Sequence, residues 1–163
     1  MNILGIDCGL ERLGWAVFSH TPNESPRYAY AASGLIKTSA KQPTHERLLV
    51  LFDQLNDVVK KHHVDHFVIE QLFFFKNQKT VIPVAQSQGA VMLSASQNGL
   101  PLEFLTPLQI KQIVTGYGNA DKESVKKMIH LQLPDIELKG KIDDEIDAIA
   151  CSLAYCCTSH NLL

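Results

Sequence analysis

The stretch MNILGIDCGLERLGWAVF, residues 1–18, decides the fold of this chain. Residues 2–6 form a short apolar run with β-branched side chains, which predicts a buried strand rather than a helix. The run ends in Asp7, and we expect Gly9 and Gly14 to let the backbone turn tightly before a returning strand. Asp7 either caps its own turn or belongs to a site. More carboxylates converging on it from elsewhere would favour the site.

Composition indicates one soluble globular domain that spans residues 1–163. Hydrophobic residues make up 45% of the chain and charged residues 20%, which is ordinary for such a domain. No apolar run approaches the roughly 20 residues of a membrane helix, and no signal peptide is visible. The net charge of −2 argues against coating nucleic acid by bulk charge. The four cysteines form no C-x-x-C pair and favour a reducing cytoplasm: Cys8, Cys151, Cys156 and Cys157.

Hydrophobic periodicity beyond residue 18 predicts an α/β protein. A third strand over 27–38 would complete an antiparallel meander with the first two. The later predicted strands cover 64–70 and 100–105, and the predicted helices cover 44–62, 81–98, 107–114, 121–133 and 143–160. Four histidines surround the end of the first helix, and we expect solvated surface rather than a metal site there: His45, His62, His63 and His66.

Acidic residues recur where elements begin or end. Glu70 closes the fourth predicted strand as Asp7 closes the first, and Asp143, Asp144 and Asp147 open the last helix. Acids stabilise a helix N-terminus by ~0.3–1 kcal/mol each, which explains one or two of them. Asp147 lies within an apolar run, where a lone buried carboxylate would be costly. Spacing alone leaves open whether Asp143 or Asp144 shares its role.

Four converging carboxylates would need cations, because like charges at close range raise one another's pKa. Oxygen ligands without His or Cys select Mg²⁺ or Mn²⁺ over zinc. Two such ions ~3.5–4 Å apart suit in-line displacement at phosphorus. The acids therefore indicate metal-dependent phosphodiester chemistry.

The segment after Glu70 is Leu72-Phe73-Phe74-Phe75, followed by Lys76. One interpretation is core plus a hydrophobic loop. The other is an exposed ring that stacks on a base while the lysines hold phosphates.

With these motifs in place, the chain resembles the RuvC family of Holliday-junction resolvases over essentially its whole length. The resemblance rests on Gly5-Ile6-Asp7-Cys8-Gly9, Ile69-Glu70-Gln71, Phe73-x-x-Lys76-Asn77 and Asp144-x-x-Asp147-Ala148-Ile149-Ala150. It implies a ribonuclease-H-like fold: a five-stranded mixed sheet, three strands antiparallel and then two parallel, with helices on both faces. Cys8 departs from the family, where proline is usual, and we expect it to point away from the acids.

The resemblance also implies residue roles. It selects Asp144 over Asp143 and assigns four ligands to two Mg²⁺ ions, for which Mn²⁺ can substitute: Asp7, Glu70, Asp144 and Asp147. Lys111 and Lys122 match basic residues close to the cleaved phosphate. The expected DNA-binding residues are Phe73, Phe74, Lys76, Lys79, Lys126 and Lys127.

The function implied is that of a homodimeric, Mg²⁺-dependent endonuclease that resolves four-way junctions in DNA recombination and repair by symmetric paired nicks. Its implied partner is a branch-migration motor of the RuvA and RuvB type, with no membrane involved. A catalytically silent junction-binding module is the alternative. A phosphotransferase of the actin-like ATPase type is a third interpretation, but 163 residues with one Asp-x-Gly hairpin do not supply the two domains it needs.

Overall fold

The computed structural model describes residues 1–21, 27–71 and 78–158, with side chains from residue 81 onward in the last range. Its elements follow the chain as β1 (Asn2–Asp7), β2 (Arg12–His20), β3 (Tyr28–Lys37), α1 (Thr44–Lys61), β4 (His66–Glu70), α2 (Gln78–Gln97), β5 (Leu102–Leu105), α3 (Pro107–Thr115), α4 (Lys122–Gln132) and α5 (Asp143–Thr158). Every strand and helix predicted from the periodicity is present, with ends displaced by a few residues.

In these described ranges five strands form one sheet in the order β3-β2-β1-β4-β5. The first three pair antiparallel, and β4 and β5 join parallel to β1. The short turn between β1 and β2 gives the antiparallel pair, whereas β4 follows the crossover helix α1. The expected mixed sheet is therefore confirmed.

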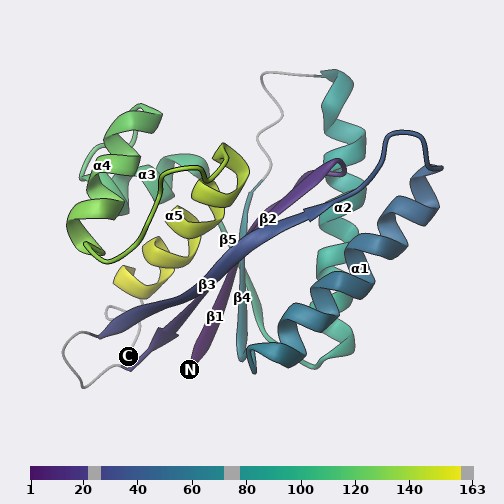
Figure 1. Cartoon of the computed structure of the whole chain (residues 1–163), viewed down its shortest axis with the longest axis horizontal. Helices are drawn as coiled ribbons and strands as arrows, with labels where there is room; N and C mark the ends of the chain where they lie inside the picture. The colour runs from purple at the N-terminus through teal and green to yellow at the C-terminus, as the bar shows by residue number, and fades with distance from the viewer. Residues whose placement is uncertain (22–26, 72–77, 159–163) are drawn as a thin grey trace.

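Helices cover both faces of the sheet (Figure 1). One core lies between the sheet and α1 with α2, and it includes Leu4, Ile6 and Leu55. The other lies between the sheet and α5, with α3 and α4 outside, and it includes Ile3 and Ile149. Side chains on a strand alternate between the two faces of the sheet, so each central strand contributes side chains to both cores.

The same alternation places two acids on one face. Ile3 faces α5, so Asp7, four residues on, also faces α5. Val68 faces α5 as well, and Glu70 follows it by two residues. The β1–β4 register pairs Ile6 with Ile69, which brings Asp7 beside Glu70 at the neighbouring position. Both carboxylates therefore meet at the carboxyl ends of two adjacent parallel strands.

Helix α5 packs closely on β1 and β2. The Ser152 hydroxyl donates a 2.9 Å hydrogen bond to the Ala16 carbonyl in the buried interface. Gly14 lies inside β2, paired with Asp7, and not in the turn as the sequence led us to expect. A Cβ at residue 14 would collide with the Asp144 carbonyl, so glycine is needed there for the approach of α5.

The expectation that His66 is solvated surface is wrong. His66 begins β4, is buried, and stacks on Tyr155 of α5 with ring centroids 4.7 Å apart. Its Nε2 lies 3.3 Å from Glu103 Oε1 on β5. The imidazole is therefore covered by α5 and by the neighbouring strand β5.

Among the helices that the structure describes, none combines the length and the apolar character needed to cross a membrane.

Candidate active site

Three carboxylates from three elements interact at the end of the sheet. Burial raises the pKa of Asp7 well above its usual value, and repulsion from Glu70, Asp147 and Asp144 raises it further. Burial, then Asp147, raises the pKa of Glu70 to about 7. Burial is also the main reason that the pKa of Asp147 is raised. Each acid thus sits where its charged form is disfavoured unless a cation compensates.

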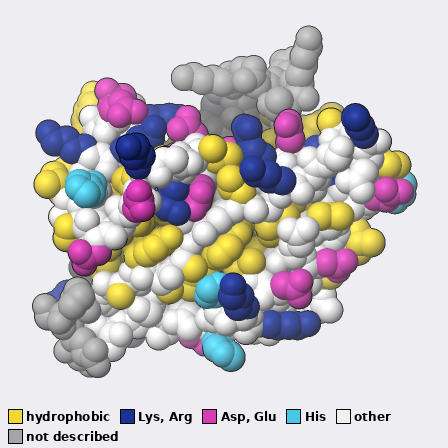
Figure 2. Space-filling model, viewed as in Figure 1, with side chains coloured by type: hydrophobic (Ala, Val, Ile, Leu, Met, Phe, Trp, Pro, Cys, Tyr) yellow, Lys and Arg dark blue, Asp and Glu magenta, His cyan; other side chains and the backbone are white. Residues whose placement is uncertain are grey.

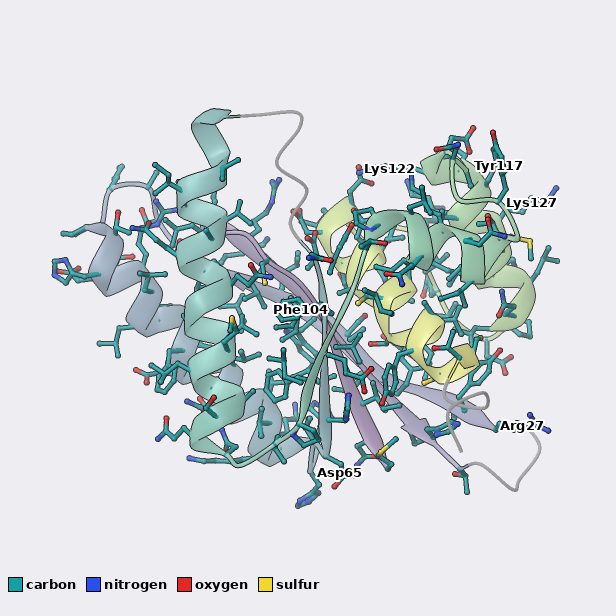
Figure 3. All side chains as sticks on the ribbon, turned by 180° about the vertical axis from the view of Figure 1, so that it is seen from behind. Arg27, Asp65, Phe104, Tyr117, Lys122 and Lys127 are labelled. Atoms are coloured by element: carbon teal, nitrogen blue, oxygen red, sulfur yellow. The ribbon has the colours of Figure 1, made fainter. Side chains whose placement is uncertain are left out.

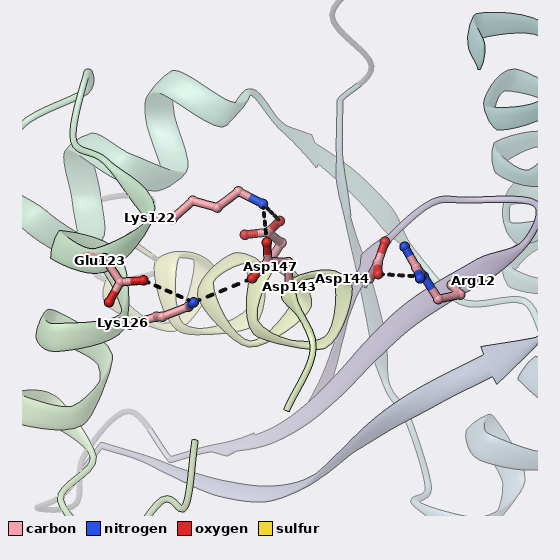
Figure 4. A network of polar contacts seen from close by, with 7 residues as sticks. All are labelled: Arg12, Lys122, Glu123, Lys126, Asp143, Asp144 and Asp147. Carbon is pink, nitrogen blue, oxygen red and sulfur yellow. Dashed lines mark hydrogen bonds and ion pairs between the residues drawn. The ribbon is translucent and has the colours of Figure 1, made fainter. Parts of the chain in front are cut away.

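The first turn of α5 separates its aspartates into two directions (Figure 4). Asp144 Oδ2 accepts from Arg12 Nε at 2.9 Å, on the β2 side of the acids. Asp143 faces the opposite side and lies 3.0 Å from Lys122 Nζ and 3.5 Å from Lys126 Nζ. Lys122, by its hydrogen bond, lowers the pKa of Asp143. Asp144 adds to the repulsion on Asp7, whereas Asp143 and Asp144 both add to the burial that raises the pKa of Asp147, so the choice of Asp144 rests on the resemblance drawn from the sequence.

A cavity of about 200 Å³ opens beside these acids. Its charged lining consists of Glu70, Asp143 and Asp147 together with three lysines: Lys111, Lys122 and Lys126. Asp144 lines a separate cavity beside Arg12. Lys122 Nζ lies 3.7 Å from Asp147 Oδ2. Figure 2 shows basic and acidic side chains interspersed over the α4 side of the molecule. Such a cavity can bind an anionic group at its lysines, provided that cations neutralise its acids.

The donor set fits hard divalent cations. The side chains that converge are carboxylates, which are the ligands of Mg²⁺ and Mn²⁺. Within the described ranges no three metal-binding side chains yet meet around one point. Two of the acids instead form ion pairs, Asp144 with Arg12 and Asp147 with Lys122.

Sequence reasoning missed Arg12, which the structure pairs with Asp144. Nothing near Arg12 in the sequence indicates this pairing, because Arg12 and Asp144 are more than a hundred residues apart. The role of Gly14 was also missed. The available signal was a glycine within a predicted strand region, because a close approach by another backbone is a usual reason for glycine there.

Several expected DNA-binding residues do not line the cavity or cannot be placed. Lys127 is exposed on α4, away from the lining side chains. Phe73, Phe74 and Lys76 lie outside the described residues, and so does the side chain of Lys79.

Cys8 lies in the α1–α2 core, on the sheet face opposite the acids. Burial raises the pKa of its thiol well above the usual value. The expectation that it points away from the acids is confirmed.

Comparisons with known proteins find relatives that match nearly the whole chain. A family model described as "Crossover junction endodeoxyribonuclease RuvC" matches residues 3–155. Curated proteins of that name from Fusobacterium nucleatum and Desulfitobacterium hafniense are 37% and 39% identical, each over 95% of this chain and over 80% and 92% of their own lengths. A solved structure, "T. thermophilus RuvC in complex with Holliday junction substrate", has 25% identity and a TM-score of 0.89, and the match covers 99% of this chain and 96% of that one. The expected ribonuclease-H-like architecture is thereby confirmed.

Proposed function

This chain belongs to the RuvC family of crossover junction endodeoxyribonucleases, and on that premise we propose that it resolves four-way DNA junctions by paired hydrolytic nicks. The observation that carries the proposal is that β1, β4 and α5 bring Asp7, Glu70 and Asp147 to one end of the sheet, beside a cavity lined by lysines. A catalytically silent module would have no need to keep buried carboxylates that repel one another, because unpaired buried charge is destabilising. The acids therefore favour the nuclease over the binding module.

We propose that Asp7, Glu70, Asp144 and Asp147 hold two Mg²⁺ ions, with Mn²⁺ as a substitute. Bound ions of this kind would activate water and stabilise the leaving oxygen. The protein's own part is to fix the acids on β1, β4 and α5, three elements packed around one core. The acids are thus preorganised by the fold rather than by a mobile loop.

Lys111 and Lys122 supply positive charge to the cavity that Glu70 and Asp147 also line. Both lower the pKa of Glu70, so both lie close enough to influence charge at the acids. A phosphate in the cavity would lie near these ammonium groups and near the acids. The lysines would then stabilise the negative charge that grows as the phosphodiester is attacked.

We propose that the active form is a homodimer, since two symmetric nicks in a two-fold junction require two sites. Helix α2 supports this, because it exposes Ile82, Met92 and Leu93 on the layer remote from α5. A second copy of the chain is the occupant that would cover them. Sedimentation should give twice the mass of the 18.1 kDa chain, and Leu93→Glu should give the single mass.

The remaining assignments rest on family membership. We propose that Lys126 and Lys127 hold phosphates, that Phe73 or Phe74 contacts junction bases beside Lys76 and Lys79, and that a branch-migration motor delivers the junction in the cytoplasm. The whole activity would reside in one nuclease domain, residues 1–163.

The test uses purified full-length protein and a synthetic mobile junction labelled on each strand. With Mg²⁺ we expect paired nicks at symmetric positions in opposing strands, and with EDTA binding without nicking. A linear duplex of the same sequence is the control. Binding that never leads to nicks in either Mg²⁺ or Mn²⁺ would support the silent module instead.

A further inference from the structure

The loop between α3 and α4 presents an aromatic side chain to solvent. Tyr117 is 61% exposed, which is the largest exposure of any aromatic side chain in the described part of the chain. Figure 3 shows it at the same end of the molecule as Lys122 and Lys127. An exposed ring among lysines combines the two features by which proteins hold single-stranded nucleic acid: a stacking platform and phosphate-binding cations.

The loop, residues 116–119, is held firmly although its ring is exposed. The Gln112 side chain bridges it, donating through Nε2 to the Gly116 carbonyl at 2.8 Å and accepting at Oε1 from the Gly118 amide at 3.0 Å. Thr115 Oγ1 accepts from the Tyr117 amide at 3.1 Å, and the Tyr117 carbonyl accepts from the Ala120 amide at 3.0 Å.

Backbone geometry adds to this rigidity. Gly116 ends α3 in the left-handed region at φ 80°, where a side chain would be strained. A loop fixed at both ends loses little conformational freedom when its side chain binds. The ring of Tyr117 is therefore preorganised on a rigid support.

The loop is also close to the proposed cleavage site along the chain. Lys111, which lines the acidic cavity, is four residues before Thr115 on α3, or about 6 Å along the helix axis. A DNA strand advances ~3.4 Å per nucleotide along its axis. Tyr117 therefore lies within a few nucleotides' length of the cavity, so a strand whose phosphate lies there can reach its ring.

We propose that Tyr117 is a DNA-contacting residue that stacks on an unpaired base two to four nucleotides from the cleaved phosphate, on the α3–α4 side of the acids, with Gln112 as the positioning residue of its loop. This inference rests on the proposed junction-resolving function and adds a second base contact to it. The contact comes from a different element than the segment after Glu70. Base stacking is tolerant of sequence, so the contact holds open the junction rather than reading its bases.

The experiment measures equilibrium binding of a four-way junction by full-length protein in the Asp7→Asn background, so that no strand is cut. Tyr117→Ala should weaken binding roughly 5- to 150-fold, while Tyr117→Trp should bind as the parent does. The dependence of binding on salt should keep its slope, because a neutral ring releases no counterions. Lys127→Ala should instead reduce that slope by about one.

A second readout follows the base itself. 2-Aminopurine is placed in turn at the second, third and fourth nucleotide from the cleaved phosphate. At one of these positions its fluorescence should change when the parent protein binds, and this change should be lost in Tyr117→Ala. Gln112→Ala keeps the ring but frees the loop, and should reduce the fluorescence change by less than Tyr117→Ala does. Adding Gln112→Ala to Tyr117→Ala should cause no further loss, because the ring that the loop positions is already absent.

Two exposed side chains serve as controls: Phe104 on β5, 38% exposed, and Leu131 on α4. Their alanine variants should bind as the parent does. The inference is overturned if Tyr117→Ala binds with parental affinity and fluorescence, if it lowers the salt slope, or if Leu131→Ala weakens binding equally. Failure of the proposed function looks different, since the wild-type protein itself would then bind the junction without nicking it, or would not bind it at all.

Discussion

Gly14 of β2 lies so close beneath Asp144 of α5 that a Cβ at residue 14 would overlap the Asp144 carbonyl oxygen. We therefore expect Gly14→Ala to push the start of α5 away from β2. Overpacking of this kind costs about 1–3 kcal/mol of unfolding free energy. A displacement near 1 Å at a catalytic group lowers rate by about 100-fold. Calorimetric melting and single-turnover nicking measure the two effects.

The larger Gly14→Val should exceed Gly14→Ala in both quantities. Parental melting and nicking in both variants would show that α5 does not need this close approach.

Lysines of the cavity should affect the chemical step more than binding. Lys122 Nζ lies 3.0 Å from Asp143 Oδ2 and 3.7 Å from Asp147 Oδ2, and Lys111 lines the same cavity. Removing one preorganised positive group costs about 10²–10³ in rate when it faces developing charge. Lys111→Ala and Lys122→Ala should each lower the single-turnover nicking rate by more than they lower junction affinity. Equal losses in rate and affinity would reduce the lysine to an ordinary phosphate contact.

His66 should make the protein less stable below pH 6.5. Burial lowers the pKa of His66, although Glu103 partly opposes the shift. The unfolded chain therefore takes up a proton as pH falls below about 6.5, while the folded protein stays neutral at this site. The contribution of His66 to the unfolding free energy should therefore be fully present above pH 6.5, and should be lost as the pH falls from 6.5 to the lowered folded-state pKa.

Urea unfolding as a function of pH measures this slope in the wild type and in His66→Gln, where the contribution of this group should vanish. Glu103→Gln removes the charge that raises the pKa of His66, so in this variant the loss of unfolding free energy should continue to lower pH. A wild-type slope that His66→Gln leaves unchanged would exclude His66 as the origin.

Phe73 and Phe74 follow Glu70 closely in sequence, so what they touch should lie near the cleaved strand. We expect one of them, when changed to Ala, to leave the melting temperature unchanged but to remove the fluorescence change of 2-aminopurine at the crossover. Base stacking on an aromatic ring is worth ~1–3 kcal/mol. The other should lower the melting temperature. If both variants melt lower and both keep the fluorescence change, the run is core.

Local patterns were sufficient to predict most of the fold. The apolar run before Asp7 and the amphipathic spacing of residues 44–62 report burial directly, because period 2 and period 3.6 are properties of the backbone. The convergence of Asp7 with Glu70 could be expected, since both end strands that the crossover helix makes parallel.

Contacts between distant segments could not be predicted in this way. The pairing of Arg12 with Asp144 and the stacking of His66 on Tyr155 depend on how α5 sits on the sheet. A single sequence shows a charge or an imidazole without its partner. The exposed Arg12 and the buried His66 were therefore missed for the same reason.

The central claim is that Asp7, Glu70, Asp144 and Asp147 form the catalytic centre of a junction resolvase. We expect Asp7→Asn, Glu70→Gln, Asp144→Asn and Asp147→Asn each to abolish nicking of a synthetic junction and to leave its binding nearly intact or slightly tighter, because lysines and backbone hold the phosphates. Asp143→Asn is the matched control, one residue from Asp144 but turned toward Lys122.

The most direct measurement is therefore single-turnover nicking by Asp144→Asn beside Asp143→Asn in the same Mg²⁺ buffer, with junction affinity measured in parallel. The account predicts no nicks from Asp144→Asn and clear nicking from Asp143→Asn, at similar affinities. An active Asp144→Asn together with an inactive Asp143→Asn would contradict it.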